Sequence, residues 1–258
     1  MSQYVYQSLS GEKLTKPEFT KYIEKKVAKT ISQFDLINRD DVVTVAVSGG
    51  KDSLVLLHIL SKFQKKHGFK LNAILIDEGI EGYRNKTIPK AQRVCDDNDV
   101  ELHIYSYKDN FGQPLDNIVK DGFHPCSVCG VFRRKLLNKH ARELKSTKLA
   151  TGHNLDDEAQ AILMNQLKHN LELSARMGPI TGLQQDKLFV PRIKPLYMIA
   201  EKEVMIYAFL HDLTDDFTEC PYVNESFRKD VQEMLNNIED KHPGAKQGLV
   251  KSFLDNLP

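Results

Sequence analysis

Short apolar runs alternate with helical segments along the first two thirds of the chain. Val42 to Val47 (VVTVAV) is a β-branched run without polar alternation, which predicts a strand covered on both faces of a parallel sheet. We expect further strands at 71–76, 101–106 and 148–151, and helices at 54–63, 83–97, 131–143 and 155–168. This alternation predicts an α/β fold with a doubly wound, mostly parallel sheet that binds ligands at the carboxyl ends of its strands.

The two ends of the chain have a different pattern. Apolar residues recur at helical spacing among lysines over residues 17–37, which predicts an amphipathic helix. From about residue 170 the alternation stops, and we expect helices at 200–211, 224–239 and 246–256. The predicted domains are a helical N-terminal extension at 1–40, an ATP-binding-type α/β domain at 41–170 and a mostly helical region at 171–258.

The composition is that of an ordinary globular protein. Of 258 residues, 41% are hydrophobic and 28% are charged, which excludes collagen-like, mucin-like and wholly disordered chains. Lys and Arg number 36 against 35 Asp and Glu, so any site for a polyanion must come from local clustering. No run is apolar enough to span a membrane, and the N-terminus lacks the pattern of a signal peptide. We therefore expect a cytoplasmic protein.

A glycine-rich hexapeptide, SGGKDS at residues 48–53, directly follows the first predicted strand of the sheet. Gly49 and Gly50 let the backbone approach an anion, and Lys51 with the hydroxyls of Ser48 and Ser53 would complete a phosphate-binding loop. The loop is not a Walker A sequence. The alternative is an ordinary turn between strand and helix, in which Asp52 or Ser53 caps the helix.

Three of the four cysteines have a spacing typical of a metal site. Cys126 and Cys129 form a CxxC after a predicted loop at 108–125, and Cys220 lies far downstream. Thiolates select zinc, copper(I) or iron–sulfur clusters, and three thiolates with one open position fit a cluster that keeps a reactive iron. The alternatives are a zinc site completed by His124, a redox pair and a buried structural thiol. The fourth cysteine, Cys95, is expected in the core.

Two further segments carry charge close to these motifs. The segment 151–160, TGHNLDDEAQ, places acids at the start of a helix, which any helix prefers. The segment 131–148 has Glu143 as its one acidic residue. Its basic residues either form a solvated face or contact phosphates. They are Arg133, Arg134, Lys135, Lys139, Arg142, Lys145 and Lys148.

The hexapeptide SGGKDS resembles the signature of the PP-loop ATP pyrophosphatase superfamily, which has an adenine-nucleotide alpha-hydrolase-like fold. CSVCG at 126–130, TGHNLDDEAQ, ECP at 219–221 and HPGAK at 242–246 are similar to the TtuA/NcsA branch of tRNA 2-thiouridine synthases. The resemblance implies ATP, Mg²⁺ and a [4Fe-4S] cluster as cofactors. It implies ATP contacts from Ala46, Val47, Ser48, Gly49, Gly50, Lys51, Asp52, Ser53, Ile76, Gly152, His153, Asn154 and Asp157. It implies catalytic roles for Lys51, Asp52, Arg133, Asp156 and Asp157, and cluster ligands at Cys126, Cys129 and Cys220.

The implied reaction is the 2-thiolation of a tRNA uridine. ATP would adenylate the C2 oxygen, and sulfide held on the open iron of the cluster would then displace AMP. The resemblance implies a homodimer and, as sulfur donor, sulfide or a ubiquitin-like thiocarboxylated carrier. The branch often has zinc fingers at both ends, whereas this chain has no cysteine before 95 or after 220, as in the archaeal NcsA-like form. We therefore expect the wobble uridine as target. The alternatives are a cluster-free persulfide enzyme and a zinc-stabilised RNA-binding protein with structural ATP.

Overall fold

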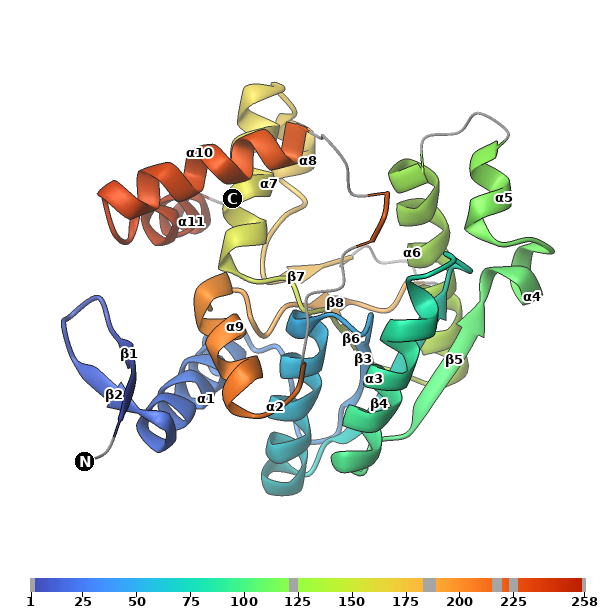
Figure 1. The fold of residues 1–258 in the computed structure, drawn as a ribbon, viewed down its shortest axis with the longest axis horizontal. Helices are drawn as coiled ribbons and strands as arrows, with labels where there is room; N and C mark the ends of the chain where they lie inside the picture. The colour runs from blue at the N-terminus through green and yellow to red at the C-terminus, as the bar shows by residue number, and fades with distance from the viewer. Residues whose placement is uncertain (1–2, 121–124, 183–188, 215–219, 223–226, 257–258) are drawn as a thin grey trace.

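A mostly parallel sheet forms the centre of the protein. The computed structural model describes residues 3–120, 125–182, 189–214, 220–222 and 227–256 (Figure 1). Within them the sheet has the order β5-β4-β3-β6-β8-β7, and β7 alone is antiparallel to its neighbour. The strands are β3 (Val42–Ala46), β4 (Lys70–Asp77), β5 (Leu102–Ser106), β6 (Lys148–Ala150), β7 (Ile180–Thr181) and β8 (Arg192–Ile193). This order confirms the predicted fold class.

Helices cover both faces of the sheet because alternate residues of its strands point to opposite sides. In β4, Leu71, Ala73 and Leu75 join one core cluster, whereas Ile74 and Ile76 join another. The first cluster packs against α1 (Lys16–Gln33), α2 (Lys51–His67), α3 (Arg84–Asp97) and α9 (Glu201–Leu210). The second packs against α4 (Tyr107–Phe111), α5 (Leu115–Lys120) and α6 (Pro125–Glu143).

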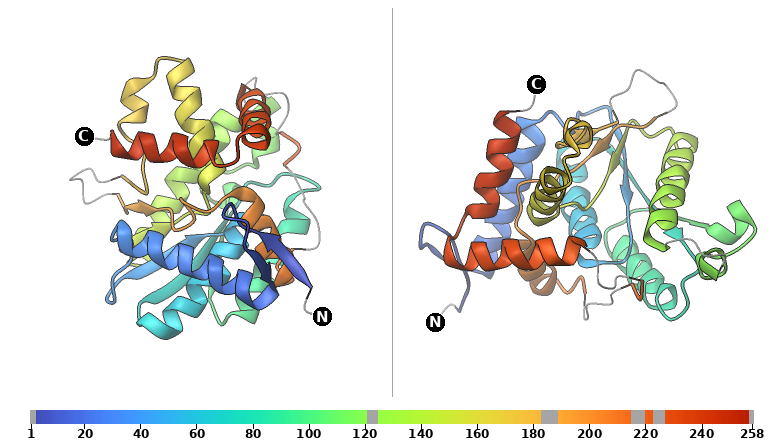
Figure 2. Two further views of the ribbon diagram at one scale, coloured as in Figure 1. Left: turned by 90° about the vertical axis from the view of Figure 1, so that its left-hand side faces the viewer. Right: turned by 90° about the horizontal axis from the view of Figure 1, so that it is seen from above.

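A third core cluster joins the C-terminal helices to the helix that follows β6. It unites α7 (Leu155–Leu167) with α10 (Phe227–Lys241) and α11 (Ala245–Asp255), which lie beside α7 in both views (Figures 1 and 2). The short α8 (Leu171–Ser174) follows α7. At the other end of the chain, β1 (Tyr4–Gln7) and β2 (Lys13–Thr15) form an antiparallel hairpin next to α1.

Several predicted elements need correction. The loop expected at 108–125 contains α4 and α5, because Ser106 caps α4, Gly112 ends it at φ +79°, and Pro114 precedes α5. The glycine and the proline thus mark helix ends. The helix expected at 131–143 begins at Pro125, so the CxxC lies in its first turn.

The pattern also missed the N-terminal hairpin and two strands of the sheet. The strands β7 and β8 come from the region expected to be mostly helical after residue 170, and β8 pairs with β6 in the central sheet. The other long helices and strands lie close to their predicted ranges, and Cys95 is buried as expected. None of the helices in the described part of the chain has both the length and the apolar character needed to cross a membrane.

Candidate functional site

The phosphate loop connects β3 to α2 and has the geometry of an anion site. Gly49 has φ +81°, and a Cβ there would lie 2.4 Å from the carbonyl oxygen of Thr87, so only glycine fits. The helix N-cap is Gly50, which has no side chain to cap the first turn of α2. The first N–H groups of α2 therefore receive no cap from the side chain of the N-cap residue and can bind an anion. The alternative of a turn capped by Asp52 or Ser53 is therefore wrong.

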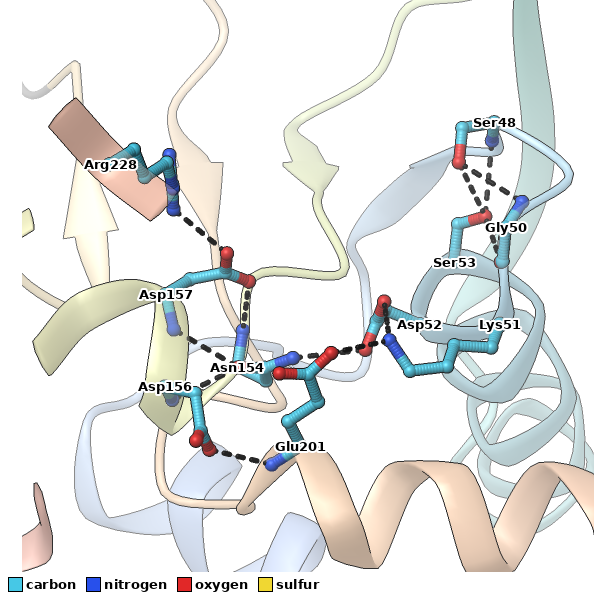
Figure 3. Close-up of polar contacts among 10 residues, drawn as sticks. All are labelled: Ser48, Gly50, Lys51, Asp52, Ser53, Asn154, Asp156, Asp157, Glu201 and Arg228. Atoms are coloured by element: carbon cyan, nitrogen blue, oxygen red, sulfur yellow. Dashed lines mark hydrogen bonds and ion pairs between the residues drawn. The ribbon is translucent and has the colours of Figure 1, made fainter. Parts of the chain in front are cut away.

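Hydroxyl groups hold the loop in this shape (Figure 3). Ser53 Oγ accepts from the amide of Ser48 at 3.1 Å and donates to the carbonyl oxygen of Gly50 at 2.9 Å. Ser48 Oγ in turn accepts from the amide of Gly50 at 3.2 Å. The loop is thus organised in the protein itself, which lowers the cost of ordering it around a ligand.

The loop opens into a cleft of about 380 Å³ at the carboxyl ends of the strands. Ten of the residues expected to bind ATP or act in catalysis line it: Ala46, Val47, Ser48, Asp52, Ser53, Ile76, Arg133, Gly152, His153 and Asp157. The other lining residues are Arg84, Gly130, Arg134, Leu137, Leu149, Thr151 and Arg192. The cleft therefore brings together the phosphate loop, the segment after β6 and the helix that carries the CxxC.

Lys51 lies beside the cleft and is held by two carboxylates (Figure 3). Its Nζ is 3.1 Å from Oδ2 of Asp52 and 2.9 Å from Oε1 of Glu201, the first residue of α9. Burial opposes the charge on Lys51, but the two carboxylates outweigh it and raise its pKa. Asp52 also accepts from Nδ2 of Asn154 at 2.9 Å, which ties α2 to the start of α7.

The segment after β6 packs directly on the phosphate loop. A Cβ on Gly152 would lie 2.9 Å from the amide nitrogen of Ser53, so the two backbones touch. Asn154 is the N-cap of α7, and Asp157 accepts from its amide at 3.2 Å in a capping box. Arg228 of α10 donates to Oδ1 of Asp157 at 2.9 Å. His153 also lines the cleft, and its Nδ1 lies 2.9 Å from Oγ1 of Thr151.

The structure separates the two candidate aspartates. Asp157 lines the cleft, whereas Asp156 is buried and forms an ion pair with Lys246 of α11. Asp156 also accepts from the amide of Glu201 at 2.7 Å. The HPGAK motif therefore supplies a lysine that neutralises a buried carboxylate outside the cleft.

The three cysteines occur in one region of the protein. Cys126 and Cys129 lie in the first turn of α6, and Cys220 packs with Cys129 in the second core cluster. Cys126 Sγ donates to the carbonyl oxygen of Tyr222 at 3.4 Å, and Tyr107 donates to the carbonyl oxygen of Cys129 at 2.9 Å. Burial raises the pKa of the Cys129 and Cys220 thiols, so as isolated groups they favour the protonated form.

The chemistry of this donor set fits an iron–sulfur cluster. Thiolates are soft ligands, and three of them would leave one position of a cluster open. Among the described residues, no three His, Cys, Asp or Glu side chains lie close enough together to hold one metal ion. A bound cluster would also offset the burial that disfavours the thiolates. His124, the alternative zinc ligand, lies outside the described residues.

A buried glutamate that the sequence analysis missed connects the two halves of the cleft. Glu78, which is 1% exposed, pairs with Arg84 and lies 3.6 Å from Nη1 of Arg133. Arg84 donates to the carbonyl oxygen of Ser48 at 2.7 Å, so the chain of contacts runs from the phosphate loop to the cysteine helix. The position of Glu78 just after β4 was the one available signal, because ligand-binding residues gather at strand ends.

Comparisons with known proteins agree with this arrangement. A family model described as a PP-loop domain matches residues 19–225. The tRNA 2-thiolation protein NcsA of Haloferax volcanii is 37% identical over 264 residues, which cover 96% of this chain and 82% of the relative. The tRNA-5-methyluridine(54) 2-sulfurtransferase of Pyrococcus horikoshii is 39% identical, covering 93% of this chain and 76% of the relative.

One solved structure is similar over nearly the whole length. It is described as the U34-tRNA thiolase NcsA from Methanococcus maripaludis with its [4Fe-4S] cluster, and it superposes with a TM-score of 0.88 at 39% identity. The match covers 98% of this chain and 84% of that chain.

Proposed function

Because the chain belongs to the PP-loop domain family, in its group of tRNA 2-thiolation proteins, we propose that it is an ATP-dependent tRNA sulfurtransferase. The product is 2-thiouridine in tRNA. The observation that carries the proposal is that one cleft is lined both by the phosphate loop and by Gly130 and Arg133, which follow Cys129 in α6. ATP and a sulfur site would thus share one space, as the transfer of sulfur to an activated uridine requires.

The nucleotide half of the cleft would bind ATP and activate the uridine. The amides of the phosphate loop bind the pyrophosphate, and Lys51 together with Mg²⁺ offsets its charge as it leaves. The C2 oxygen of the uridine attacks the α-phosphorus of ATP, and pyrophosphate is released. We assign the adenine to the backbone around Ile76, and Mg²⁺ binding or proton transfer to Asp157.

The sulfur half would deliver the nucleophile. A [4Fe-4S] cluster on Cys126, Cys129 and Cys220 supplies, when bound, an iron with an open position for sulfide. The sulfur attacks C2 of the adenylated uridine, and AMP leaves with the original C2 oxygen. Arg133 lies between the two halves and would stabilise negative charge as it develops on the α-phosphate. In this scheme Asp156 has a structural rather than a catalytic role.

The finer assignments are also proposals. The relative of known structure acts on U34, and that match supports the wobble uridine as target; the Pyrococcus relative acts on position 54. We propose free sulfide or a ubiquitin-like thiocarboxylated carrier as the sulfur donor and a homodimer as the working form. Free rather than paired cysteines support a cytoplasmic location, where thiols stay reduced.

The test compares the wild-type protein with Cys220→Ala, purified without oxygen. We expect about four iron and four labile sulfide atoms per wild-type chain. We expect the variant to lose the cluster and 2-thiouridine formation while it still binds ATP. A folded, ATP-binding variant that makes normal 2-thiouridine would overturn the proposal. Activity of metal-free wild-type protein would favour a persulfide mechanism. A protein that contains zinc but no iron, and that releases no AMP in the presence of tRNA, would instead be an RNA-binding protein. Nucleoside analysis of tRNA fragments would distinguish position 34 from position 54.

A further inference from the structure

The arginines that line the cleft fall into two pairs with different surroundings. Arg84 and Arg133 both face the carboxylate of Glu78. Arg134 of α6 and Arg192 of β8 line the same cleft, but neither has an ion pair or a side-chain hydrogen bond within the described residues. Among the described residues, one carboxylate thus faces the first pair and none forms an ion pair with the second.

The second pair is held together at an electrostatic cost. Burial, and after it the charge of Arg134, lowers the pKa of Arg192, and no carboxylate acts in the other direction. The backbone places the two residues on different elements, because Arg192 lies opposite Leu149 in the register of β8 and β6 while Arg134 belongs to α6, and both line the cleft. An anion bound between the two guanidinium groups would relieve the repulsion between them.

The backbone also makes room for one of these guanidinium groups beside the sulfur site. A Cβ built on Gly130 would lie 3.2 Å from Nη1 of Arg134, so a larger residue would crowd the guanidinium. Gly130 directly follows Cys129, and the guanidinium of Arg134 lies against it, one turn back along α6. The phosphate loop lies on the other side of β6, since β6 separates β8 from β3 in the sheet.

We propose that Arg134 and Arg192 form a second anion site that binds a phosphate group, separate from the phosphate loop. Guanidinium groups suit this ligand because their planar N–H pairs match two phosphate oxygens. The phosphate is either a phosphodiester of the tRNA next to the target uridine or the phosphate of ATP that the phosphate loop does not hold. The position of Arg134 on α6, the helix that carries Cys126 and Cys129, favours the phosphodiester, because the uridine must approach the sulfur. The RNA source rests on the proposed function, whereas the anion site does not.

The test uses the variant R134Q/R192Q, with R39Q/R93Q as a control that removes the same two charges from exposed positions outside the cleft lining. The affinities for unmodified tRNA and for ATP are measured separately over a range of salt concentrations. If the site binds RNA, tRNA affinity falls by about 10- to 100-fold and the salt slope falls by about one, with unchanged ATP affinity. If the site binds ATP, its affinity falls by a similar factor and tRNA binding follows the control.

Stability separates a binding role from a structural one. Because the two guanidinium groups repel each other, R134Q/R192Q should unfold at the same temperature as the wild type or higher. R192K should recover part of the lost affinity, since it keeps the charge but loses the planar donor pair. Affinities for both ligands equal to those of R39Q/R93Q would overturn the anion site. If wild-type protein binds no tRNA, the proposed function fails, and the ATP measurement alone then decides the anion site.

Discussion

Oε1 of Glu201 lies 2.9 Å from Nζ of Lys51, which joins the first residue of α9 to the lysine of the phosphate loop. The amide of the same Glu201 donates to Asp156, which in turn pairs with Lys246. The lysine that the sequence assigns to phosphate is therefore positioned by a contact network that extends to the C-terminal helix α11. This network makes Glu201 a positioning residue, because it acts on the ligand through Lys51.

Glu201→Gln should lower kcat by about tenfold while the KM for ATP changes by less than about threefold. The amide keeps the side-chain shape but removes the charge that fixes the ammonium, and it also removes a negative charge near the phosphates. Steady-state kinetics of AMP release measure both constants. Glu24→Gln is the matched control, because Glu24 also pairs with a lysine, Lys62, at 2.8 Å, outside the cleft lining. If Glu201 acts through Lys51, Glu201→Gln has no further effect in a Lys51→Ala background.

The adjacent aspartates should respond in opposite ways. Asp157→Asn should lower kcat by about 100-fold or more, because Asp157 lines the cleft and is the candidate for acid–base or Mg²⁺ chemistry. Asp156→Asn should instead lower the free energy of unfolding by about 3 kcal/mol, because it leaves the buried Lys246 ammonium without its partner. Urea unfolding and activity per folded molecule are measured for both. Full activity of Asp157→Asn would contradict this division.

Glu78→Gln should destabilise the protein by about 3 kcal/mol, because the neutral amide leaves the buried Arg84 guanidinium without its counter-ion. It should also weaken ATP binding, since Arg84 anchors the carbonyl oxygen of Ser48. Denaturant unfolding and ATP titration give the two quantities. The exposed pair of Asp99 with Lys65 provides the comparison, and Asp99→Asn should cost less than about 1 kcal/mol. Equal losses of unfolding free energy in the two variants would contradict the role of Glu78 as a buried counter-ion of Arg84.

Stability should fall as the pH drops from about 6.5 towards 4. Burial, and after it the charges of Lys62, His58 and Lys16, lower the pKa of His211 to about 4 from 6.5, while Glu24 acts in the opposite direction. The unfolded chain therefore binds a proton in this window that the folded protein does not, so acid favours unfolding. His211→Gln should flatten this part of the pH profile of the unfolding free energy, measured by urea titration. A profile with the wild-type slope would show that His211 does not titrate as described.

Local patterns predicted the elements that carry a periodic signal. The unbroken run at β3, the glycines of the phosphate loop and the helical spacing of α3 each extend over enough residues to be recognised. The strands β7 and β8 have two residues each and no period, so only their pairing in the sheet defines them. The helices α4 and α5 were missed because their end signals, Gly112 and Pro114, resemble those of a loop.

The sequence predicted the site residues that lie in one continuous segment, but not those that the fold brings together from distant segments. Eight of the expected ATP contacts lie within one stretch, 46–53, whereas Glu78, Arg192 and Glu201 come from three other elements. No local signal distinguishes Arg192 and Glu201 from ordinary surface charges, and Glu78 has only its position just after β4. Asp156 and Asp157 show the same limit at the scale of one residue. Neighbours on a helix point about 100° apart, and only the packing of α11 shows which one turns away from the cleft.

The contact of Gly152 with the first turn of α2 has a consequence for the order of binding. Because the two backbones that surround the nucleotide already touch, this wall of the cleft behaves as one stiff body and cannot part to let a large molecule in. Widening of the cleft must come from the opposite wall, formed by α6. If the cleft binds ATP as proposed, the ATP site is complete before RNA binds, and a tRNA that bound first would have to leave a path for the nucleotide past α6.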